Sequence, residues 1–555
     1  MELIKGFPAT SQDRYPLNVT NIIKHSVRNY GPQEIASRRL DGSMFRYTYS
    51  DAYERMQRLA NGLTKLGVKV GDRVGVLAWN SNENYEVYFG VPGMGAVMLL
   101  LNLRLTPQDL AYVVEHSGCE YIIVDETLLP IAHALAPLCP QIKGYVVITM
   151  PGKKMSDVET PLENTHSYEE LLAESDPVFD WPMMEETSAY AACYTTGTTG
   201  KPKGVYYSHR DVYLHSMCIG MNTGMNVKDT CCQIVPMFHA LGWGLPQAAT
   251  LVGSRIILPG MYTLETLDSL SKLIVDEGVT MSAGAPAIFM PLLEYIRNLE
   301  ERPDLTGVRL LSGATEPPVS MMKGFWDMTG AEIIHAYGAT ETTPLVTINR
   351  LMPWLETSLS EDERWNLKKK QGFAVGGLDV KVVDATLKDV AHDGKTPGEI
   401  LIRGPWITGA YHNAPGSEAS FTEDGFWRSG DVGTMDENGY LKITDRVKDV
   451  IKSGGEWISS VDMENEIISH NDVLDAAVVG VEHPKWQERP LALVVLRDDA
   501  KGKVNADDIR AHLSNVFAKW QLPDEVLFVD EIPKTSVGKT DKKVIRAEHK
   551  DMYSE

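Results

Sequence analysis

Helical and extended segments alternate along the first third of the chain, and this alternation limits the fold more than any other feature. Apolar residues recur at helical spacing from Tyr53 to Leu66, with Ser50 as a candidate N-cap and Gly67 as a candidate C-cap. The run RVGVLAWN from Arg73 is short and mostly apolar, as in a buried strand. Such alternation predicts an α/β fold in which helices cover parallel sheets.

A second helix is predicted from its terminal residues. Thr106 is a candidate N-cap, Pro107 suits the first turn, and Asp109 follows at the third helical position. The helix is expected to end near Gly118, before the strand-like run EYIIVD. This second helix and strand extend the same α/β pattern.

The pattern changes after Asp445 and Arg446, where short strand-like runs and helical stretches follow a glycine pair. We expect a large N-terminal domain over residues 1–444 and a small C-terminal domain over residues 447–555. Residues 151–182 are polar and acidic, and are expected to form a surface excursion or a plain linker.

Charge and composition exclude several classes of partner. The 555 residues include 75 acidic and 53 basic side chains, a formal net charge of −22. Nucleic-acid binders carry the opposite charge, so neither nucleic acid nor an anionic membrane is expected as the main partner. No apolar stretch is long enough for a transmembrane segment, and six cysteines without metal-ligand spacing favour a reducing compartment. We expect a cytoplasmic protein, and the sequence leaves its oligomeric state open, a homodimer included.

The strongest local motif is a glycine- and threonine-rich run between Tyr194 and Gly204. Its glycines let backbone N–H groups face an anion, and its hydroxyls and lysines suit a polyphosphate. It is not a Walker A loop, because Pro202 follows Lys201. Taken alone, such a run is also common in surface turns. The candidate phosphate-binding residues are Thr195, Thr196, Gly197, Thr198, Thr199, Gly200 and Lys201.

Together with five further motifs, this run resembles the acyl-adenylate-forming superfamily of acyl-CoA synthetases, peptide-synthetase adenylation domains and beetle luciferases. The resemblance extends from about residue 25 to residue 545. The further motifs are PMFHALGWGLP from Pro236, LLSGATEPP from Leu310, HAYGATETTP from His335, WRSGDVG from Trp427, and TDRVKDVIKSGGEWIS continued by PKTSVGK from Pro533. The resemblance implies a large N-terminal domain of helix-covered, mostly parallel sheets plus a β-barrel-like subdomain, and a small mobile C-terminal α+β domain.

HAYGATETTP contains the residue types that a nucleotide needs, although an ordinary turn with one exposed acid is the alternative. Tyr337 offers a flat ring for adenine, Thr340 a hydroxyl for a phosphate, and Glu341 a carboxylate for a hard cation. The resemblance implies that Glu341 and Thr195 hold Mg²⁺ and that Asp431, placed after a strand-like segment, accepts hydrogen bonds from the ribose. It implies further contacts with ATP or AMP from Gly313, Ala314, Thr315, His335, Ala336, Gly338, Ala339, Arg446 and Lys448.

Lys539 in PKTSVGK is the catalytic residue that the resemblance implies for the first half-reaction. Its charge would stabilise the transition state in which a carboxylate attacks the α-phosphorus of ATP. In isolation, this basic run is typical of a solvated surface. Thiol attack needs the same space, so the small domain is expected to rotate. The resemblance implies that the hinge lies at residues 445–446, with Asp445 as the hinge residue. Coenzyme A is then expected to pass Gly454, Gly455, Glu456 and Trp457, with Glu488 and Arg489 at the entrance or forming a rim ion pair.

The implied reaction joins a carboxylic acid to coenzyme A with ATP and Mg²⁺, through acyl-AMP. PMFHALGWGLP lacks an aspartate for an α-amino group, which favours an apolar acid. The resemblance places His239 by the reacting carboxylate and Trp243 at the acyl tunnel, with core packing as the alternative for Trp243. Gly284, Ala285, Gly313, Gly338 and Thr343 are expected to line the acyl pocket.

A medium-chain fatty acid is the first expectation for the substrate. A methylmercaptopropionate-type thioether acid, or an acid of another chain length, is the second. Three other activities stay open: a luciferase-like oxygenase, a ligase that passes the acyl group to a carrier protein, and a silent nucleotide sensor. A silent sensor would be expected to lose Lys539, Glu341 or Asp431, and all three are present.

Overall fold

The computed structural model describes residues 4–7, 9–10, 14–195, 201–263, 266–453, 456–534 and 540–553, without the side chains of Glu456 and Trp457. Packing divides the chain into two compact units. Unit 1 comprises Met1–Asp379 and Ile402–Trp427, and unit 2 comprises Val380–Leu401 and Arg428–Glu555. This division reports packing within the chain, so the hinge at 445–446 stays a prediction about movement.

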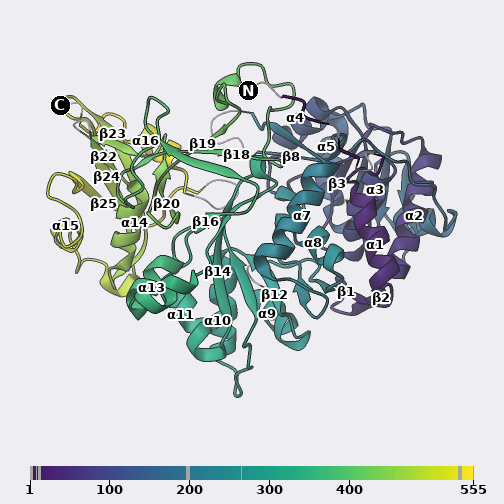
Figure 1. The fold of residues 1–555 in the computed structure, drawn as a ribbon, viewed down its shortest axis with the longest axis horizontal. Coiled ribbons are helices and arrows are strands. Elements are labelled where there is room, and N and C mark those ends of the chain that lie inside the picture. The colour runs from purple at the N-terminus through teal and green to yellow at the C-terminus, as the bar shows by residue number, and fades with distance from the viewer. Residues whose placement is uncertain are drawn as a thin grey trace. The chain divides into compact units, whose positions relative to one another are not determined.

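Unit 1 contains a seven-stranded sheet in the order β7-β6-β5-β3-β4-β8-β9, parallel except for the β8–β9 hairpin. Its strands are β3 (Arg73–Leu77), β4 (Val97–Leu100), β5 (Cys119–Asp125), β6 (Gly144–Ile148), β7 (Thr165–Ser167), β8 (Ala189–Tyr194) and β9 (Gly204–Ser208). The helices in this part of the chain are α1 (Val19–Tyr30), α2 (Tyr49–Leu66), α3 (Asn82–Gly93), α4 (Pro107–Ser117), α5 (Leu129–Leu135) and α6 (Tyr168–Ala173). Helices α1, α2 and α3 pack together, at the purple end of the colour range in Figure 1.

The second sheet of unit 1 has nine strands in the order β16-β15-β14-β13-β12-β10-β11-β1-β2, and is parallel from β14 to β1. Its strands are β1 (Glu34–Arg38), β2 (Met44–Thr48), β10 (Thr230–Cys232), β11 (Arg255–Leu258), β12 (Met281–Gly284), β13 (Arg309–Ser312), β14 (Glu332–Gly338), β15 (Leu345–Ile348) and β16 (Phe373–Ala374). The helices of this part are α7 (His209–Thr223), α8 (Leu245–Val252), α9 (Leu267–Asp276), α10 (Pro286–Arg297), α11 (Val319–Thr329), α12 (Pro353–Ser358) and α13 (Glu361–Lys368). The predicted α/β fold with mostly parallel sheets is thus confirmed.

Unit 2 holds the bulk of a four-stranded sheet, where a β-barrel-like subdomain was expected, and a five-stranded sheet. The four strands are β17 (Asp379–Val383), β18 (Gly398–Arg403), β19 (Trp427–Met435) and β20 (Leu441–Arg446). The five are β21 (Ile451–Ser453), β22 (Glu456–Ile458), β23 (Val473–His483), β24 (Gln487–Leu496) and β25 (Glu525–Phe528), accompanied by α14 (Ser460–Ser469), α15 (Ala506–Leu513) and α16 (Lys542–Glu548). The expected small α+β part at the C-terminus is therefore present.

Local capping chemistry explains where two of the predicted helices begin and end. Helix α4 has Thr106 as its N-cap and Gly118 as its left-handed C-cap, as predicted. The N-cap of α2 is Thr48, so the prediction of Ser50 was wrong. The Thr48 side chain accepts a hydrogen bond from the Asp51 N–H while the Asp51 carboxylate accepts from the Thr48 N–H, a reciprocal pair that Ser50 cannot form.

The segment 151–182 is not a plain linker, because it adds strand β7 and helix α6 to unit 1. The Tyr168 hydroxyl of α6 donates to the fully buried Glu86 carboxylate at 2.8 Å. Arg55 of α2 donates to Glu86 at 2.8 Å and to Glu169 of α6 at 2.6 Å. Burial raises the pKa of Glu86, and the Arg55 charge opposes that rise. These contacts fix the segment against α2 and α3.

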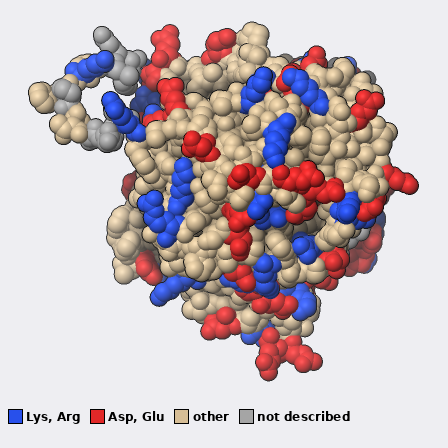
Figure 2. Space-filling view, turned by 90° about the vertical axis from the view of Figure 1, so that its right-hand side faces the viewer, with Lys and Arg blue, Asp and Glu red and all other residues tan. Residues whose placement is uncertain are grey.

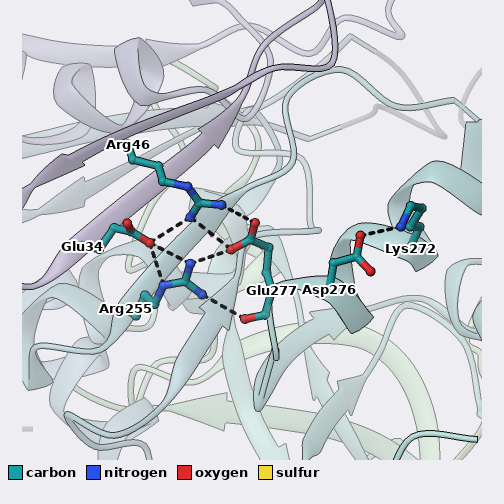
Figure 3. Close-up of polar contacts among 6 residues, drawn as sticks. All are labelled: Glu34, Arg46, Arg255, Lys272, Asp276 and Glu277. Atoms are coloured by element: carbon teal, nitrogen blue, oxygen red, sulfur yellow. Dashed lines mark hydrogen bonds and ion pairs between the residues drawn. The ribbon is translucent and has the colours of Figure 1, made fainter.

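A more exposed ion-pair network joins strands β1, β2 and β11 (Figure 3). Arg46 and Arg255 each contact both Glu34 and Glu277. Hydrogen bonding from Arg46 holds the pKa of Glu277 below its usual range. Figure 3 also shows the separate pair between Lys272 and Asp276, four residues apart on α9, with 65% and 53% of the two side chains exposed.

Replacing Arg55 with methionine is expected to lower the free energy of unfolding by about 3–5 kcal/mol, because Glu86 would remain buried without its cation. Lys272→Met removes a surface pair and serves as the control, with an expected loss of about 0.5 kcal/mol or less. Urea unfolding followed by tryptophan fluorescence measures both variants. Equal losses of unfolding free energy in the two variants would contradict a larger contribution from the buried Arg55–Glu86 pair.

Acidic and basic side chains are interspersed on the face that Figure 2 draws, so this face has no continuous basic field for a phosphate backbone. Within the described part of the chain, no helix is both long enough and apolar enough to span a membrane.

Candidate active site

The phosphate loop begins and ends in the β8–β9 hairpin. Thr195 follows β8 directly, and its N–H donates to the Lys203 carbonyl at 2.9 Å, while the Lys203 N–H donates to the Thr195 hydroxyl at 3.1 Å. These bonds join the residue after β8 to the residue before β9. The predicted phosphate-binding residues Thr196, Gly197, Thr198, Thr199 and Gly200 lie outside the described residues. The Lys201 ammonium lies 4.6 Å from the centre of the Tyr112 ring.

Glu341 lies in η6 (Thr340–Thr342), three residues after the last residue of β14. Its Oε1 accepts a hydrogen bond from the Tyr411 hydroxyl at 2.7 Å, and its backbone carbonyl accepts from the Thr408 N–H at 2.8 Å. The carbonyl of Thr340 accepts from the Tyr207 hydroxyl at 2.7 Å. Both the backbone and the side chain of this turn are therefore held by neighbours within unit 1.

Gly338 is required because the chain folds back onto it. A Cβ at this position would lie 2.0 Å from the Pro344 carbonyl oxygen, closer than any side chain allows. The same carbonyl accepts a hydrogen bond from the Ala339 N–H at 3.2 Å. Gly338 is therefore needed by the turn that carries Glu341, and its contacts with the nucleotide and the acid stay predictions.

Tyr411 joins the phosphate-loop hairpin to Glu341. Its ring lies under the Lys203 ammonium, 4.6 Å from ring centre to nitrogen, and its hydroxyl donates to Glu341. The next residue, His412, donates its N–H to the Gly204 carbonyl at 2.9 Å. The structure therefore brings together two motifs that lie more than a hundred residues apart in the chain.

Sequence reasoning missed Tyr411 and its neighbour Trp427. Tyr411 lies in an irregular segment with no helical or strand period, and a lone tyrosine there carries no motif signal. Trp427 belongs to the WRSGDVG motif, but that motif was interpreted through Asp431 alone. No sequence signal points to Tyr411, whereas Trp427 could have been noted as an indole donor within that motif.

The acyl-side motifs meet at Trp243 and Gly313. A Cβ at Gly313 would lie 3.0 Å from the Trp243 ring and 3.1 Å from the Ala336 carbonyl. Trp243 is half-buried in η4 (Ala240–Gly244) and also packs on the main core of unit 1, so the packing alternative is not removed. His239, which precedes η4, has an exposed side chain.

Gly284 ends β12 and Gly313 directly follows the neighbouring strand β13, and the Gly313 N–H donates to the Gly284 carbonyl at 3.2 Å. Gly284 also lies against the buried Phe289 ring, which a Cβ would approach to 3.2 Å. Ala285 follows as the N-cap of α10. Of these three residues, Gly313 is the one that lies against the Trp243 ring.

Other predicted residues of unit 1 have contacts within the protein. The Thr343 hydroxyl is buried and donates to the Trp406 carbonyl at 2.6 Å. His335 is buried, its Nδ1 lies 2.7 Å from the Lys369 carbonyl, and burial lowers its pKa to about 4, so the ring is neutral at pH 7. Tyr337 is half-buried, whereas Ala314 and Thr315 are exposed.

In unit 2, Asp431 and Arg446 face each other on β19 and β20. Arg446 Nε lies 3.1 Å from Asp431 Oδ1, and the Asp431 side chain is 8% exposed. Asp431 lies inside β19, not after a strand as expected, because the strand continues to Met435. The pairing brings the predicted ribose acceptor and a predicted phosphate-side cation together.

The side chain of the predicted hinge residue Asp445 is hydrogen-bonded to the first residue of α14 in unit 2. One Asp445 carboxylate oxygen accepts from both the N–H and the hydroxyl of Ser460, each at 2.6 Å, at the start of α14. The Lys542 ammonium of α16 donates to the Ser460 hydroxyl at 2.6 Å and pairs with Glu464 at 2.8 Å. Burial raises the pKa of Asp445, and the Lys542 charge opposes that rise.

The residues expected near coenzyme A are described only in part. Glu488 accepts a hydrogen bond from the Lys452 N–H at 2.7 Å. The alternative of a rim pair between Glu488 and Arg489 was wrong, because Arg489 is buried and pairs with Asp524 at 2.6 Å. Gly454, Gly455 and Lys539 lie outside the described residues, as do the side chains of Glu456 and Trp457.

The residue chemistry fits a Mg²⁺ ion that arrives with a nucleotide. Among the residues that the structure describes, no group of three or more His, Cys, Asp or Glu side chains could hold a metal ion. Mg²⁺ bound mainly through substrate phosphates needs only one or two protein oxygens. The Glu341 carboxylate and the Thr195 hydroxyl are hard oxygen donors of this kind.

Comparison with known proteins identifies the class. A family model described as AMP-binding enzyme matches residues 23–412, and one described as AMP-binding enzyme C-terminal domain matches residues 462–539. The chain therefore belongs to the family of AMP-binding enzymes, which confirms the resemblance drawn from the motifs.

Similar proteins extend over the full length of the chain. A long-chain-fatty-acid–CoA ligase of Thermus thermophilus is 43% identical, with 100% of this chain and 99% of the relative covered. A 3-methylmercaptopropionyl-CoA ligase of Ruegeria lacuscaerulensis is 37% identical (97% and 98% covered), and a medium-chain-fatty-acid–CoA ligase of Ectopseudomonas oleovorans is 36% identical (97% of each covered).

Solved structures share the fold. ATP-bound MatB from Rhodopseudomonas palustris superposes with a TM-score of 0.80 at 24% identity, covering 97% of this chain and 100% of that one. The anthranilate CoA ligase AuaEII, in complex with anthranoyl-AMP, has a TM-score of 0.82 at 23% identity, with 99% and 100% covered.

Proposed function

We propose that this enzyme is an AMP-forming acid–CoA ligase. A carboxylate oxygen of the acid attacks the α-phosphorus of ATP, the bond to pyrophosphate breaks, and acyl-AMP forms. The thiol of coenzyme A then attacks the acyl carbon, AMP leaves, and a thioester results. Full-length relatives that are named CoA ligases support this reaction.

The observation that carries the proposal is the junction at Tyr411. The Tyr411 side chain contacts both Lys203, which flanks the phosphate loop, and the Glu341 carboxylate. A site for a metal-bound triphosphate needs phosphate-binding and metal-binding groups close together. Bound there, Mg²⁺ would neutralise charge on the phosphates of the nucleotide. Thr195 and Glu341 are the residues proposed to hold it.

The remaining roles follow the same chemistry. Tyr337 is proposed to lie against the adenine, and Asp431 to accept hydrogen bonds from the ribose hydroxyls. Lys539 is proposed to stabilise the charge that develops on the α-phosphate. Rotation at Asp445 is proposed to withdraw Lys539 and admit coenzyme A, so that one site serves both half-reactions.

The acid is proposed to be apolar and of medium chain length, with a short thioether acid or a longer acid as the alternatives. The small residues Gly284, Ala285 and Gly313 are proposed to line the acyl pocket, and Gly313 lies against the Trp243 ring, which a Cβ would approach to 3.0 Å. No charged residue occurs in PMFHALGWGLP apart from the titratable His239, which favours an apolar chain.

Pyrophosphate release across a panel of straight-chain, thioether and aromatic acids tests the proposal. We expect acid-dependent release with ATP, the highest kcat/KM for a medium-chain acid, and thioester only when coenzyme A is present. Release of ADP and phosphate, or no dependence on any acid, would overturn it. The same assay run without oxygen excludes a luciferase-like oxygenase if the thioester still forms, and an added carrier protein tests for acyl transfer to that acceptor.

Trp243→Ala is expected to shift the preferred acid toward longer chains, because the ring that closes the space beside Gly313 is removed. We expect the ratio of kcat/KM for long over medium acids to rise about tenfold, the usual scale for a change of a few methylenes in a pocket. Trp354→Ala, at an indole that is 61% exposed, is the matched control. An unchanged chain-length profile would make Trp243 an ordinary core residue.

A further inference from the structure

The Tyr411 hydroxyl has a fixed hydrogen-bond direction. The Trp427 indole N–H, which can only donate, gives a hydrogen bond to the Tyr411 oxygen at 3.1 Å. An ionised carboxylate can only accept, so the tyrosine proton points to Glu341 Oε1 at 2.7 Å. Tyr411 and Trp427 are 9% and 4% exposed, so water competes little for either bond. The two hydrogen bonds therefore run in one direction, from Trp427 to Tyr411 and from Tyr411 to Glu341.

Residues 408–412 hold Glu341 and the exit strand of the phosphate loop at the same time. The Thr408 N–H bonds to the backbone of Glu341, and the His412 N–H bonds to the Gly204 carbonyl at the start of β9. Tyr411 lies between Thr408 and His412 in the sequence, and its ring makes a cation–π contact with the Lys203 ammonium. This short segment therefore contacts both motifs that the sequence analysis assigns to nucleotide binding.

Core packing alone does not account for this arrangement. The Tyr411 ring packs near Phe421, with 5.8 Å between ring centres, and phenylalanine at position 411 would keep that contact. Packing does not require a hydroxyl that donates to Glu341, the single acid of η6. A hydrogen bond to a charged group in a water-poor site is among the stronger polar contacts in a protein.

We propose that Tyr411 is a positioning residue for Glu341: its hydroxyl sets the orientation of the carboxylate before the metal-bound nucleotide arrives. This inference rests on the proposed function, because it assigns Tyr411 a role in the cation site. A carboxylate that is already oriented loses little further freedom when it binds a cation. Through Lys203, the same tyrosine ties that orientation to the phosphate-loop hairpin.

Tyr411→Phe tests the proposal, because it removes the hydroxyl and keeps the ring. We expect the dissociation constant for Mn²⁺–ATP, measured by calorimetry without any acid present, to rise about 10-fold or more. The Mg²⁺ concentration for half-maximal pyrophosphate release should rise by a similar factor. The affinity for supplied acyl-AMP, which binds without a metal ion, should stay within about twofold.

Tyr49→Phe is the matched control, since it removes another buried hydroxyl that donates to the Ser254 carbonyl at 2.7 Å, away from this site. Trp427→Phe removes only the indole donor and is expected to raise the Mn²⁺–ATP dissociation constant about threefold. This variant tests the two connected hydrogen bonds if Tyr411→Phe does not fold. Equal weakening of Mn²⁺–ATP and acyl-AMP, or no change in either, would overturn the positioning role. The binding measurement needs no turnover, so it distinguishes this failure from failure of the proposed reaction.

Discussion

Lys539→Ala is expected to lower acid-dependent pyrophosphate release about 100-fold or more, while thiolysis of supplied acyl-AMP by coenzyme A stays within about threefold. The reason is that the ammonium stabilises charge that develops only while the α-phosphorus is attacked, and removal of one such group commonly has an effect of this size. Initial rates of the two half-reactions, measured separately, give the result.

The neighbouring Lys543 provides the control, because its side chain is exposed and it lies four residues further along the chain. Lys543→Ala should leave both half-reactions unchanged. Equal loss of both rates in Lys539→Ala would contradict the assignment of this lysine to the first half-reaction alone.

Gly338→Ala is expected to lower pyrophosphate release by about 100-fold and to destabilise the fold by about 1–3 kcal/mol. The new Cβ would lie 2.0 Å from the Pro344 carbonyl oxygen, so the turn that carries Glu341 must move. A displacement of about 1 Å in a catalytic group has this order of effect on rate, and overpacking has this order of effect on stability.

Gly376→Ala is the appropriate comparison, since a Cβ there meets nothing within 4 Å. Kinetics and thermal unfolding of the two variants should separate clearly. A Gly338→Ala enzyme with normal activity would show that the turn tolerates the shift and that its geometry does not hold Glu341 in place.

The parts of the fold that could be predicted are those with local chemical signals. Thr106 and Gly118 delimit α4 as expected, because a hydroxyl N-cap and a left-handed glycine act within one turn. The same reasoning was wrong at α2, where Thr48 and Ser50 are both plausible caps. Only the reciprocal bond with Asp51 decides between them.

The parts that could not be predicted depend on contacts distant in sequence. The segment 151–182 has the composition of a linker, yet Tyr168 and Glu169 tie it to Glu86 and Arg55. The candidate site shows the same limit, since the motifs contain Glu341 and Lys203 but nothing in the sequence connected either residue to Tyr411. Motif chemistry identifies groups that touch a ligand, whereas groups that position them emerge only from the fold.

The path of oxygen from the acid tests the central claim most directly. If a carboxylate oxygen attacks the α-phosphorus, an acid labelled with ¹⁸O must leave one labelled oxygen in AMP after coenzyme A cleaves the bond between the acyl carbon and that oxygen. Mass spectrometry of AMP from a single turnover is expected to show this one label per molecule. Label in inorganic phosphate or pyrophosphate, or AMP without label beside a labelled thioester product, would contradict an acyl-adenylate mechanism.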